Sequence, residues 1–169
     1  MKNEVIPVEI RALIPTTHGS AIFIGNDEKV FVIQVENRMG AVIDMFKRGV
    51  PKERPLTHDL INSIFKGLGV TVERVLITKL ENATYYALLR LKQQNELGTN
   101  VIEIDARPSD SIALAVAHQK PIYVTRALFD QVEDMSAVLE QAQRDAEDAE
   151  AAENEDDETG ESDEEEEEE

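Results

Sequence analysis

The sequence contains no cysteine and no tryptophan, and aromatic residues make up only 5% of its 169 positions. Without cysteine the chain cannot form a disulfide, a thiolate zinc site or a cysteine nucleophile. No apolar run approaches the roughly 20 residues that a membrane-spanning helix requires, and the first residues do not have the pattern of a signal peptide. We therefore expect a cytoplasmic protein with no membrane partner.

Basic residues are scarce in the last part of the chain, and their distribution divides the sequence in two. Residues 1–140 hold 16 of the 17 basic and 18 of the 35 acidic residues, whereas residues 141–169 hold one basic and 17 acidic residues. The formal charge of −18 is therefore −2 in the first part and −16 in the second. We expect a nearly neutral folded domain at 1–140, without the long basic run that grips nucleic acid through bulk charge.

The acidic tail at 141–169 is predicted to be disordered. From about residue 145 it consists of Asp, Glu, Ala, Ser, Thr, Gly and Asn, and it ends in six glutamates at 164–169. Like charges repel, and no apolar residues are present to offset the entropy of ordering. Because alanine and glutamate favour helix, the first turns of the tail are expected to extend the preceding helix. Two roles stay open, a solubilising extension and an imitation of nucleic acid that occupies or repels the phosphate site.

Alternating apolar residues predict several strands. One face of residues 4–14 carries Ile6, Val8, Ile10, Ala12 and Ile14, and short strands near 21–25 and 29–36 follow after short turns. These three segments form an antiparallel meander, because the loops are too short for parallel crossovers. Further strands are predicted at 70–80, 83–92, 100–106 and 122–125.

Helical periodicity predicts four helices between these strands. The first covers about 37–48, with Asn37 as N-cap, and the second begins after Thr57 as N-cap. The third covers about 108–118, with Pro108 at its first position, and the fourth begins at about 134. The second helix has an apolar stripe formed by Leu60, Ile61, Ile64, Phe65 and Leu68. Helices mixed with antiparallel hairpins indicate an α+β fold, with an antiparallel or mixed sheet meander and packed helices.

Two polar stretches hold the candidate functional residues. They are Arg54-Pro55-Leu56-Thr57-His58-Asp59-Leu60 and Asp105-Ala106-Arg107-Pro108-Ser109-Asp110, with Glu103 just upstream. Alternation places Glu103 and Asp105 on one face of their strand, and Asp110 lies in the first turn of the next helix. Converging carboxylates with a nearby histidine are the hard ligands that hold Mg²⁺ or Mn²⁺, and such an ion assists phosphodiester hydrolysis.

For any one of these residues taken alone, a structural role is favoured over a functional one. An acid such as Asp59 or Asp110 in the first turn of a helix is stabilised by the helix dipole, and Asp105 with Arg107 is a possible structural ion pair. His58 is interpreted with equal weight as a surface residue or a site residue. We expect His18 and His118 to be surface or loop residues, and Tyr85 and Tyr86 to pack in the sheet.

Three motifs resemble the bifunctional nuclease domain family of bacteria and plants. They are Arg-Pro-Leu-Thr-His-Asp-Leu at 54–60, Thr-Tyr-Tyr-Ala at 84–87 and Asp-Ala-Arg-Pro-Ser-Asp-Ser-Ile-Ala-Leu-Ala at 105–115. The likeness covers residues 5–130 in the order and spacing of the family. It implies a compact α+β domain that self-associates, with a dimer favoured, and hydrolysis of phosphodiester bonds in DNA and RNA.

The residues carried over from these motifs are assigned roles by their chemistry. His58, Asp59, Asp105 and Asp110 are the candidate catalytic residues, with His58 as the group that shuttles a proton. Asp59, Asp105 and Asp110 are the candidate ligands of a divalent cation, Mg²⁺ or Mn²⁺. Phosphate binding is assigned to Arg54, Arg107 and Ser109.

Two functions from different classes follow. The first is a metal-assisted nuclease whose substrate and partner is nucleic acid. The alternative is a non-enzymatic binding or regulatory module, whose polar motifs form a ligand pocket or an oligomer contact. The near-neutral domain favours the second function, and the joint pattern of motifs favours the first. Convergence of His58, Asp59, Asp105 and Asp110 in space distinguishes the two.

Overall fold

The computed structural model describes residues 4–160, and the chain divides into two compact units after Asp134. In the described part, the first unit contains every strand and helices α1 to α4, and the second contains α5 (Ser136–Gly160). The predicted α+β class is confirmed. None of the helices in the described residues is long and apolar enough to cross a membrane.

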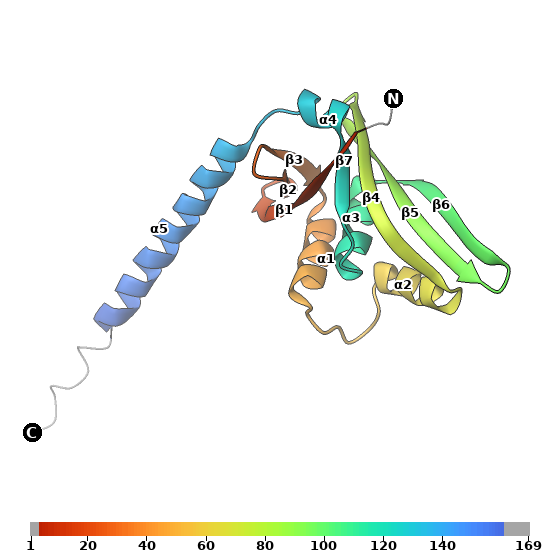
Figure 1. Ribbon diagram of the computed structural model, residues 1–169. Coiled ribbons are helices and arrows are strands. Elements are labelled where there is room, and N and C mark those ends of the chain that lie inside the picture. The colour runs from red at the N-terminus through yellow and green to blue at the C-terminus, as the bar shows by residue number, and fades with distance from the viewer. Residues whose placement is uncertain (1–3, 161–169) are drawn as a thin grey trace, which may run out of the picture. The chain divides into compact units, whose positions relative to one another are not determined.

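The first unit is built on a seven-stranded sheet with the order β3-β2-β1-β7-β4-β5-β6 (Figure 1). Neighbouring strands are antiparallel except β4 and β7, which are parallel. The predicted meander is confirmed, because β1, β2 and β3 pair in chain order. The strands are β1 (Val5–Thr16), β2 (Gly19–Gly25), β3 (Val30–Val35), β4 (Val70–Glu81), β5 (Thr84–Asn95), β6 (Gly98–Ala106) and β7 (Ile122–Thr125).

The short strand β7 joins the two halves of the sheet. It pairs with residues 5–8 of β1 on one side and with residues 75–77 of β4 on the other. The pattern of the sequence predicted β7 as a strand without indicating its neighbours. Its central place makes the β1–β3 meander and the β4–β6 meander one continuous sheet.

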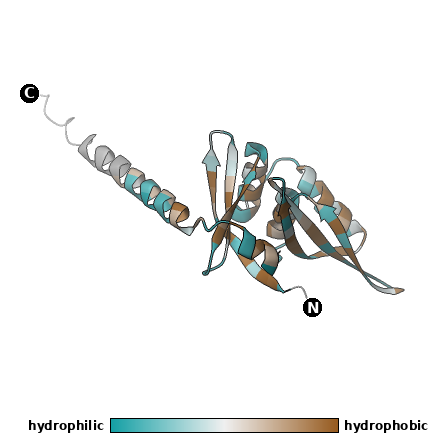
Figure 2. Cartoon of the chain, turned by 90° about the horizontal axis from the view of Figure 1, so that it is seen from above, coloured by the Kyte–Doolittle hydropathy of each residue, from teal (hydrophilic) through white to brown (hydrophobic). Residues whose placement is uncertain are grey.

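The core lies between the sheet and the helices α1 (Asn37–Arg48) and α3 (Pro108–Ala117). Hydrophobic residues run along the strands of the sheet in Figure 2, interrupted by hydrophilic ones. The side chains with no measurable exposure come from both halves of the sheet and from both helices, and they include Ile22, Ile24, Ile43, Val75, Ile77, Ile112 and Val124. This burial is the main favourable contribution to the stability of the unit.

A glycine lets α1 approach the sheet closely. A Cβ atom placed on Gly40 would lie 2.2 Å from Oγ of Ser20 in β2, a distance that no side chain tolerates. Ser20 is itself buried, at 4% exposure, so it has little room to move away. The absence of a side chain at position 40 therefore sets the distance between α1 and β2.

The helix starts differ from the predictions by one residue. Glu36 rather than Asn37 occupies the N-cap of α1, and Leu56 rather than Thr57 occupies the N-cap of α2 (Thr57–Gly67). At α2 the cap is provided by Asp59, whose Oδ2 accepts the N–H of Leu56 at 2.8 Å. An acid three residues into a helix satisfies this donor as well as an N-cap side chain does. A further short helix, α4 (Arg126–Gln131), was not predicted.

The apolar stripe predicted for α2 is only partly buried. Ile61 and Phe65 pack against the core. Three other members of the stripe are exposed, at 57% for Leu60, 48% for Ile64 and 62% for Leu68. The helix therefore presents a second apolar face that no other part of the described chain covers.

In the second unit, α5 extends beyond the first turns of the acidic tail, to Gly160. The strong helix propensity of alanine, glutamine and glutamate accounts for this length. The charge boundary predicted at residue 140 falls inside this helix. The rest of the predicted disordered tail, residues 161–169, lies outside the described residues.

Candidate functional site

The third motif forms the junction between β6 and α3. Arg107 has an extended backbone at the N-cap of α3, and Pro108 occupies the first helical position, as predicted. Proline is favoured there because its missing N–H would have no partner in the first turn. Asp110 is the acid of this first turn.

His58 and Asp110 are brought together although 52 positions separate them. Nε2 of His58 lies 3.1 Å from Oδ1 of Asp110. The histidine comes from the first turn of α2 and is buried, at 7% exposure. Its ring meets the ring of Phe46 edge to face, with 6.4 Å between centroids. Phe46 and Asp110 therefore hold the imidazole in one orientation.

Arg107 binds the other oxygen of the same carboxylate. Its Nε donates to Oδ2 of Asp110 at 2.8 Å, and this contact raises the pKa of Arg107, so the guanidinium stays charged. The Arg107 side chain is 68% exposed and that of Asp110 is 31% exposed. Asp110 thus links a buried histidine to an arginine that is open to solvent.

Asp59 does not join this network. Both of its carboxylate oxygens contact Nζ of Lys52, at 2.8 and 2.9 Å. Burial alone would raise the pKa of Asp59, but the hydrogen bonds from Lys52 and from the N–H of Leu56 outweigh it, and the pKa is lowered. Nζ of Lys52 also lies 3.8 Å from the centroid of the Phe46 ring. Asp59 therefore stabilises the start of α2.

Asp105 and Glu103 lie on the opposite face of the sheet from the core. Asp105 pairs with Leu88 in the ladder between β5 and β6, whereas the neighbouring Ile104 pairs with the buried Leu89. Glu103 lies 3.5 Å from the guanidinium of Arg90. The prediction that Glu103 and Asp105 share a face is confirmed. Because α3 packs on the core face, the turn into α3 carries Asp110 away from them.

The predicted ligand set for a divalent ion is not assembled in this structure. Within residues 4–160, no group of three or more histidine or acidic side chains has an arrangement that would hold a metal ion. The oxygens of Asp59 and Asp110 already have cationic or N–H partners inside the protein. Grouping Asp59, Asp105 and Asp110 as ligands of one ion therefore does not match the geometry, and the cation requirement itself stays a prediction.

A groove of about 380 Å³ lies beside the start of α3 and is called the α3 groove below. Arg107, Pro108 and Ser109 line it from the third motif, and Thr84 and Tyr85 line it from the second. The Tyr85 hydroxyl donates to the backbone oxygen of Val32 at 3.3 Å, and burial raises the pKa of this tyrosine. The Tyr85 ring also packs against the core, as predicted.

All three motifs therefore meet at one place. The first contributes His58, the second borders the α3 groove, and the third provides Arg107, Ser109 and Asp110. Arg54 is exposed in the loop before α2 and does not line the groove. His58 does not line it either, because Asp110 stands between the imidazole and Arg107.

Three residues near this network were not candidates from the sequence. Ser111 is completely buried, and its Oγ has no hydrogen-bond partner among the described residues. Lys52 and Phe46 position Asp59 and His58. Phe46 was predicted only as part of an apolar helix face, and Lys52 belongs to a loop without periodicity. Only the position of Ser111 inside the third motif could have drawn attention to it.

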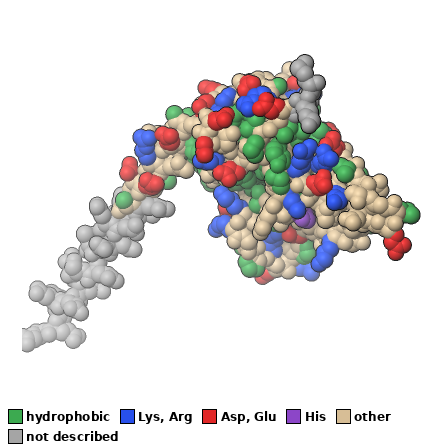
Figure 3. Space-filling view, in the orientation of Figure 1, with side chains coloured by type: hydrophobic (Ala, Val, Ile, Leu, Met, Phe, Trp, Pro, Cys, Tyr) green, Lys and Arg blue, Asp and Glu red, His purple; other side chains and the backbone are tan. Residues whose placement is uncertain are grey.

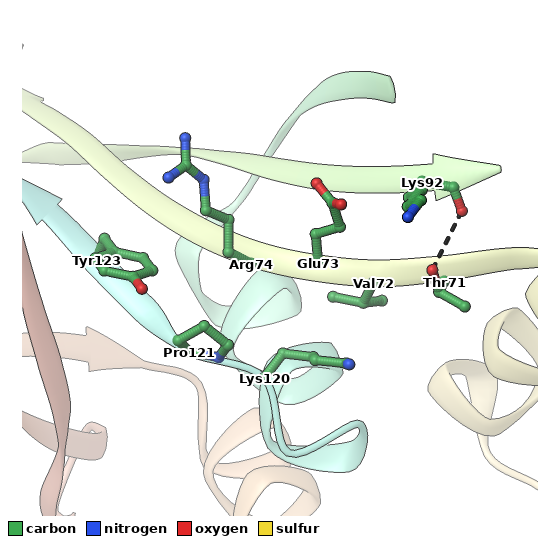
Figure 4. A pocket seen from close by; sticks show the side chains of 8 residues that line it. All are labelled: Thr71, Val72, Glu73, Arg74, Lys92, Lys120, Pro121 and Tyr123. Atoms are coloured by element: carbon green, nitrogen blue, oxygen red, sulfur yellow. Dashed lines mark hydrogen bonds between the residues drawn. The ribbon is translucent and has the colours of Figure 1, made fainter. Parts of the chain in front are cut away.

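A second hollow, of about 420 Å³, lies at the start of β4 and is called the β4 hollow below (Figure 4). Its lining comes from β4, β5, the loop after α3 and β7. Arg74, Lys92 and Lys120 make it basic, and Tyr123 contributes an aromatic ring. None of these residues was a candidate from the sequence, because they are scattered along the chain.

Comparison with known proteins agrees with the motifs. Residues 22–136 match the family model of the bifunctional nuclease domain. Two proteins of Mycobacterium tuberculosis, uncharacterized protein MT1877 of strain CDC 1551 and uncharacterized protein Rv1829 of strain H37Rv, are each 36% identical to the chain over 106 residues. That alignment covers 63% of this chain and 60% of each relative.

The chain belongs to the bifunctional nuclease domain family. The matched segment contains the end of β2, the strands β3 to β7 and the helices α1 to α4, and therefore His58, Arg107 and Asp110. The acidic part of α5 lies outside it.

Proposed function

We propose that the chain is a nuclease that hydrolyses phosphodiester bonds of DNA and RNA at the start of α3. The observation that supports this most is the placement of Asp110, which connects the buried His58 to the exposed Arg107 beside the α3 groove. An exposed guanidinium next to a helix N-terminus suits a phosphate group. A carboxylate paired with a histidine suits the transfer of a proton.

Binding begins when Arg107 turns from Asp110 to the phosphate. A guanidinium forms two parallel hydrogen bonds to phosphate, and the free N–H groups in the first turn of α3 add to the attraction. Ser109 lines the same groove and offers a hydroxyl. Local contacts of this kind replace bulk charge, since cationic and anionic side chains are interspersed on the visible face of the first unit (Figure 3).

Hydrolysis then uses the oxygen of Asp110 that Arg107 has released. As a water oxygen attacks phosphorus, its proton passes to the pair formed by Asp110 and His58, and the bond from phosphorus to the leaving oxygen breaks. The leaving oxygen takes a proton back from the same pair. Because His58 is buried, it acts by orienting Asp110 and sharing its proton.

A divalent cation stays a proposal from the sequence, because the carboxylates are not arranged as a ligand set. Hydrolysis of single-stranded DNA and RNA by the full chain, measured with Mg²⁺, with Mn²⁺ and with a chelator, decides this point. Hydrolysis that continues in the presence of the chelator would assign the chemistry to His58, Arg107 and Asp110. Hydrolysis that requires the cation would show that an ion enters with the substrate.

The alternative, a non-enzymatic binding module, is favoured by the lack of an assembled ligand set and by the α3 groove. The same assay separates the two functions. Nucleic acid that binds without being cut under any of the three conditions would overturn the proposed nuclease. The cytoplasmic location stays a prediction from the composition.

A further inference from the structure

The helix α2 is attached to the rest of the first unit through one narrow face. Among the residues of α2, all of which the structure describes, only His58 is buried. Ile61 and Phe65 are partly buried against the core, whereas Leu60 and Ile64 on the other side are exposed, at 57% and 48%. A helix of 11 residues is marginal by itself and takes most of its stability from packing. The position of α2 therefore depends on few contacts.

Two hydrogen bonds join side chains of α2 to α3, and each contains a histidine. At the start of α2, Nε2 of His58 lies 3.1 Å from Oδ1 of Asp110. One turn later, Oδ1 of Asn62 lies 2.7 Å from Nε2 of His118, which is the C-cap residue of α3. Within residues 4–160, these are the side-chain hydrogen bonds between the two helices. The Asn62–His118 contact is thus a second connection between the helices that carry the proposed site.

His58 and Asn62 lie on the same side of α2. Successive residues of an α-helix are about 100° apart around its axis, so residues four positions apart are separated by about 40°. A rotation of α2 that moved Asn62 away from His118 would therefore also move Nε2 of His58 away from Asp110. It follows that the Asn62–His118 contact fixes the rotation of α2 about its axis, and with it the direction of the His58 ring.

The other hydrogen bonds of α2 act at its ends. Asp59 bonds to Lys52 and to the N–H of Leu56, both of which precede the helix. At the other end, the side-chain amide of Gln93 in β5 donates to the backbone oxygen of Leu68 at 3.2 Å. Backbone atoms lie close to the helix axis, since the Cα atoms follow a cylinder of radius about 2.3 Å. The bond from Gln93 therefore holds the end of α2 with little effect on its rotation.

The chemistry of the Asn62–His118 contact gives it one direction. An amide oxygen only accepts, so Nε2 of His118 donates and carries the proton of the neutral ring. Burial and the charge of Lys120 lower the pKa of His118, so the ring is neutral at pH 7. Lys120 follows α3 and also lines the β4 hollow (Figure 4). The imidazole thus offers a single defined donor to Asn62.

The contact is remote from the α3 groove. Asn62 and His118 both line another hollow, of about 670 Å³, which also contains the acid Asp59 and the base Lys66 and is formed by α2, the end of α3 and the start of β4. Arg107 lines the α3 groove, and neither Asn62 nor His118 does. Any effect of the contact on hydrolysis must therefore act through α2.

We propose that Asn62 and His118 are positioning residues of the proposed nuclease site, which hold α2 in the rotation that brings His58 within hydrogen-bond distance of Asp110. This inference rests on the proposed function for the role of the His58–Asp110 pair. A proton passes between an imidazole and a carboxylate only while the two groups are within hydrogen-bond distance. A displacement of α2 by about 1 Å would therefore slow hydrolysis.

Two substitutions of His118 separate the hydrogen bond from the imidazole itself. The amide nitrogen of glutamine reaches the position of Nε2, whereas the shorter asparagine reaches only the position of Nδ1. In the full chain, His118→Gln should therefore keep the bond to Asn62 and His118→Asn should lose it. Both variants remove the imidazole, so a difference between them reports the contact.

NMR of the histidine rings gives a readout of the site that does not depend on hydrolysis, and the chain has only three histidines. In wild type and in His118→Gln, the ring nitrogens of His58 should report one tautomer fixed by Asp110. In His118→Asn they should move toward the averaged values of a free imidazole. The kcat for single-stranded RNA should fall about tenfold or more in this variant. KM should stay within about twofold of wild type, because Arg107 is untouched.

Gln93→Leu is the matched control, because it also removes a side-chain hydrogen bond that holds α2. It should leave the His58 signals and kcat near the wild-type values. Asn62→Leu removes the acceptor from the other side of the contact and should reproduce His118→Asn, so the test does not depend on the folding of one variant. In the wild-type chain itself, a His118 ring that carries its proton on Nδ1 in place of Nε2 would overturn the inference.

Unchanged His58 signals in His118→Asn and Asn62→Leu would also overturn it, as would equal changes in Gln93→Leu. Loss of the single tautomer in His118→Gln would show that the donor at Nε2 is not what matters, with the same consequence. These failures would leave the proposed nuclease intact. A wild-type chain that cuts no nucleic acid would overturn the nuclease and leave the NMR result on α2 standing.

Discussion

Nε2 of His58 lies 3.1 Å from Oδ1 of Asp110, and this contact joins the first turn of α2 to the first turn of α3. The two residues come from motifs that are remote in the sequence and have no local reason to meet. His58 is buried, whereas Asp110 is bound on its other oxygen by the exposed Arg107. A histidine fixed by a carboxylate in this way has a defined tautomer and can share a proton with it.

His58→Gln should lower the rate of hydrolysis about 10²-fold, because the variant retains a hydrogen-bonding group but cannot carry the proton. A purely structural role for His58 would instead lower the stability of the variant and leave kcat of the folded protein near the wild-type value. Hydrolysis rates and urea titrations of the two proteins distinguish these outcomes.

The ion pair between Lys52 and Asp59 should make the protein sensitive to acid. The pKa of Asp59 is lowered in the folded state, so the folded chain binds fewer protons than the unfolded chain in the pH range below the ordinary value of about 3.9. The stabilisation is present above that value and is lost as the pH falls through the folded pKa. Asp59→Asn should reduce the free energy of unfolding by about 1 kcal/mol at pH 7, and urea titrations should show this difference disappearing at low pH.

His118 should titrate below its ordinary value of about 6.5 in NMR spectra of the folded chain, because burial and Lys120 both disfavour its charged form. The folded pKa lies below the unfolded one, so the stability contributed by this residue is present above the unfolded pKa and is lost as the pH falls. Lys120→Gln should move the midpoint upward. An unchanged midpoint in that variant would contradict the assigned cause.

Removal of the hydroxyl of Ser111 should stabilise the protein. This side chain is fully buried and its Oγ has no partner among the described residues, so Ser111→Ala removes a desolvated polar atom and should raise the free energy of unfolding by about 1 kcal/mol. Ser109→Ala, two residues earlier and on the α3 groove, is the control that should not stabilise. Loss of stability in Ser111→Ala would indicate that its hydroxyl has a bound partner.

Local patterns were sufficient to predict the strands, most helices and the fold class. They were less accurate where long-range packing decides the structure. A register shift between Ile10 and Ala12 in the pairing with β2 allows Leu13 to pack against the core, so the predicted apolar face of the first strand is interrupted. The partners of β7 also depend on contacts between remote segments, for which a short apolar run has no signature.

The candidate site was predicted in part for the same reason. Arg107 and Asp110 belong to one local motif, and a helix turn brings them together. The contact between His58 and Asp110 depends on how α2 and α3 pack, which one sequence does not specify. For Asp105 the prediction was misled by nearness in the sequence. Asp105 lies on the outer face of β6, and the turn into α3 places Asp110 on the other side of the sheet.

The most direct test of the proposed nuclease compares Asp110→Asn with Asp105→Asn. Both substitutions remove one carboxylate from the same motif and keep its size, but only Asp110 contacts both His58 and Arg107. Hydrolysis of labelled single-stranded RNA and DNA by purified full chains should fall about 10²-fold or more in Asp110→Asn and stay near the wild-type rate in Asp105→Asn. Equal residual activity in the two variants, or a greater loss in Asp105→Asn, would contradict the proposed site.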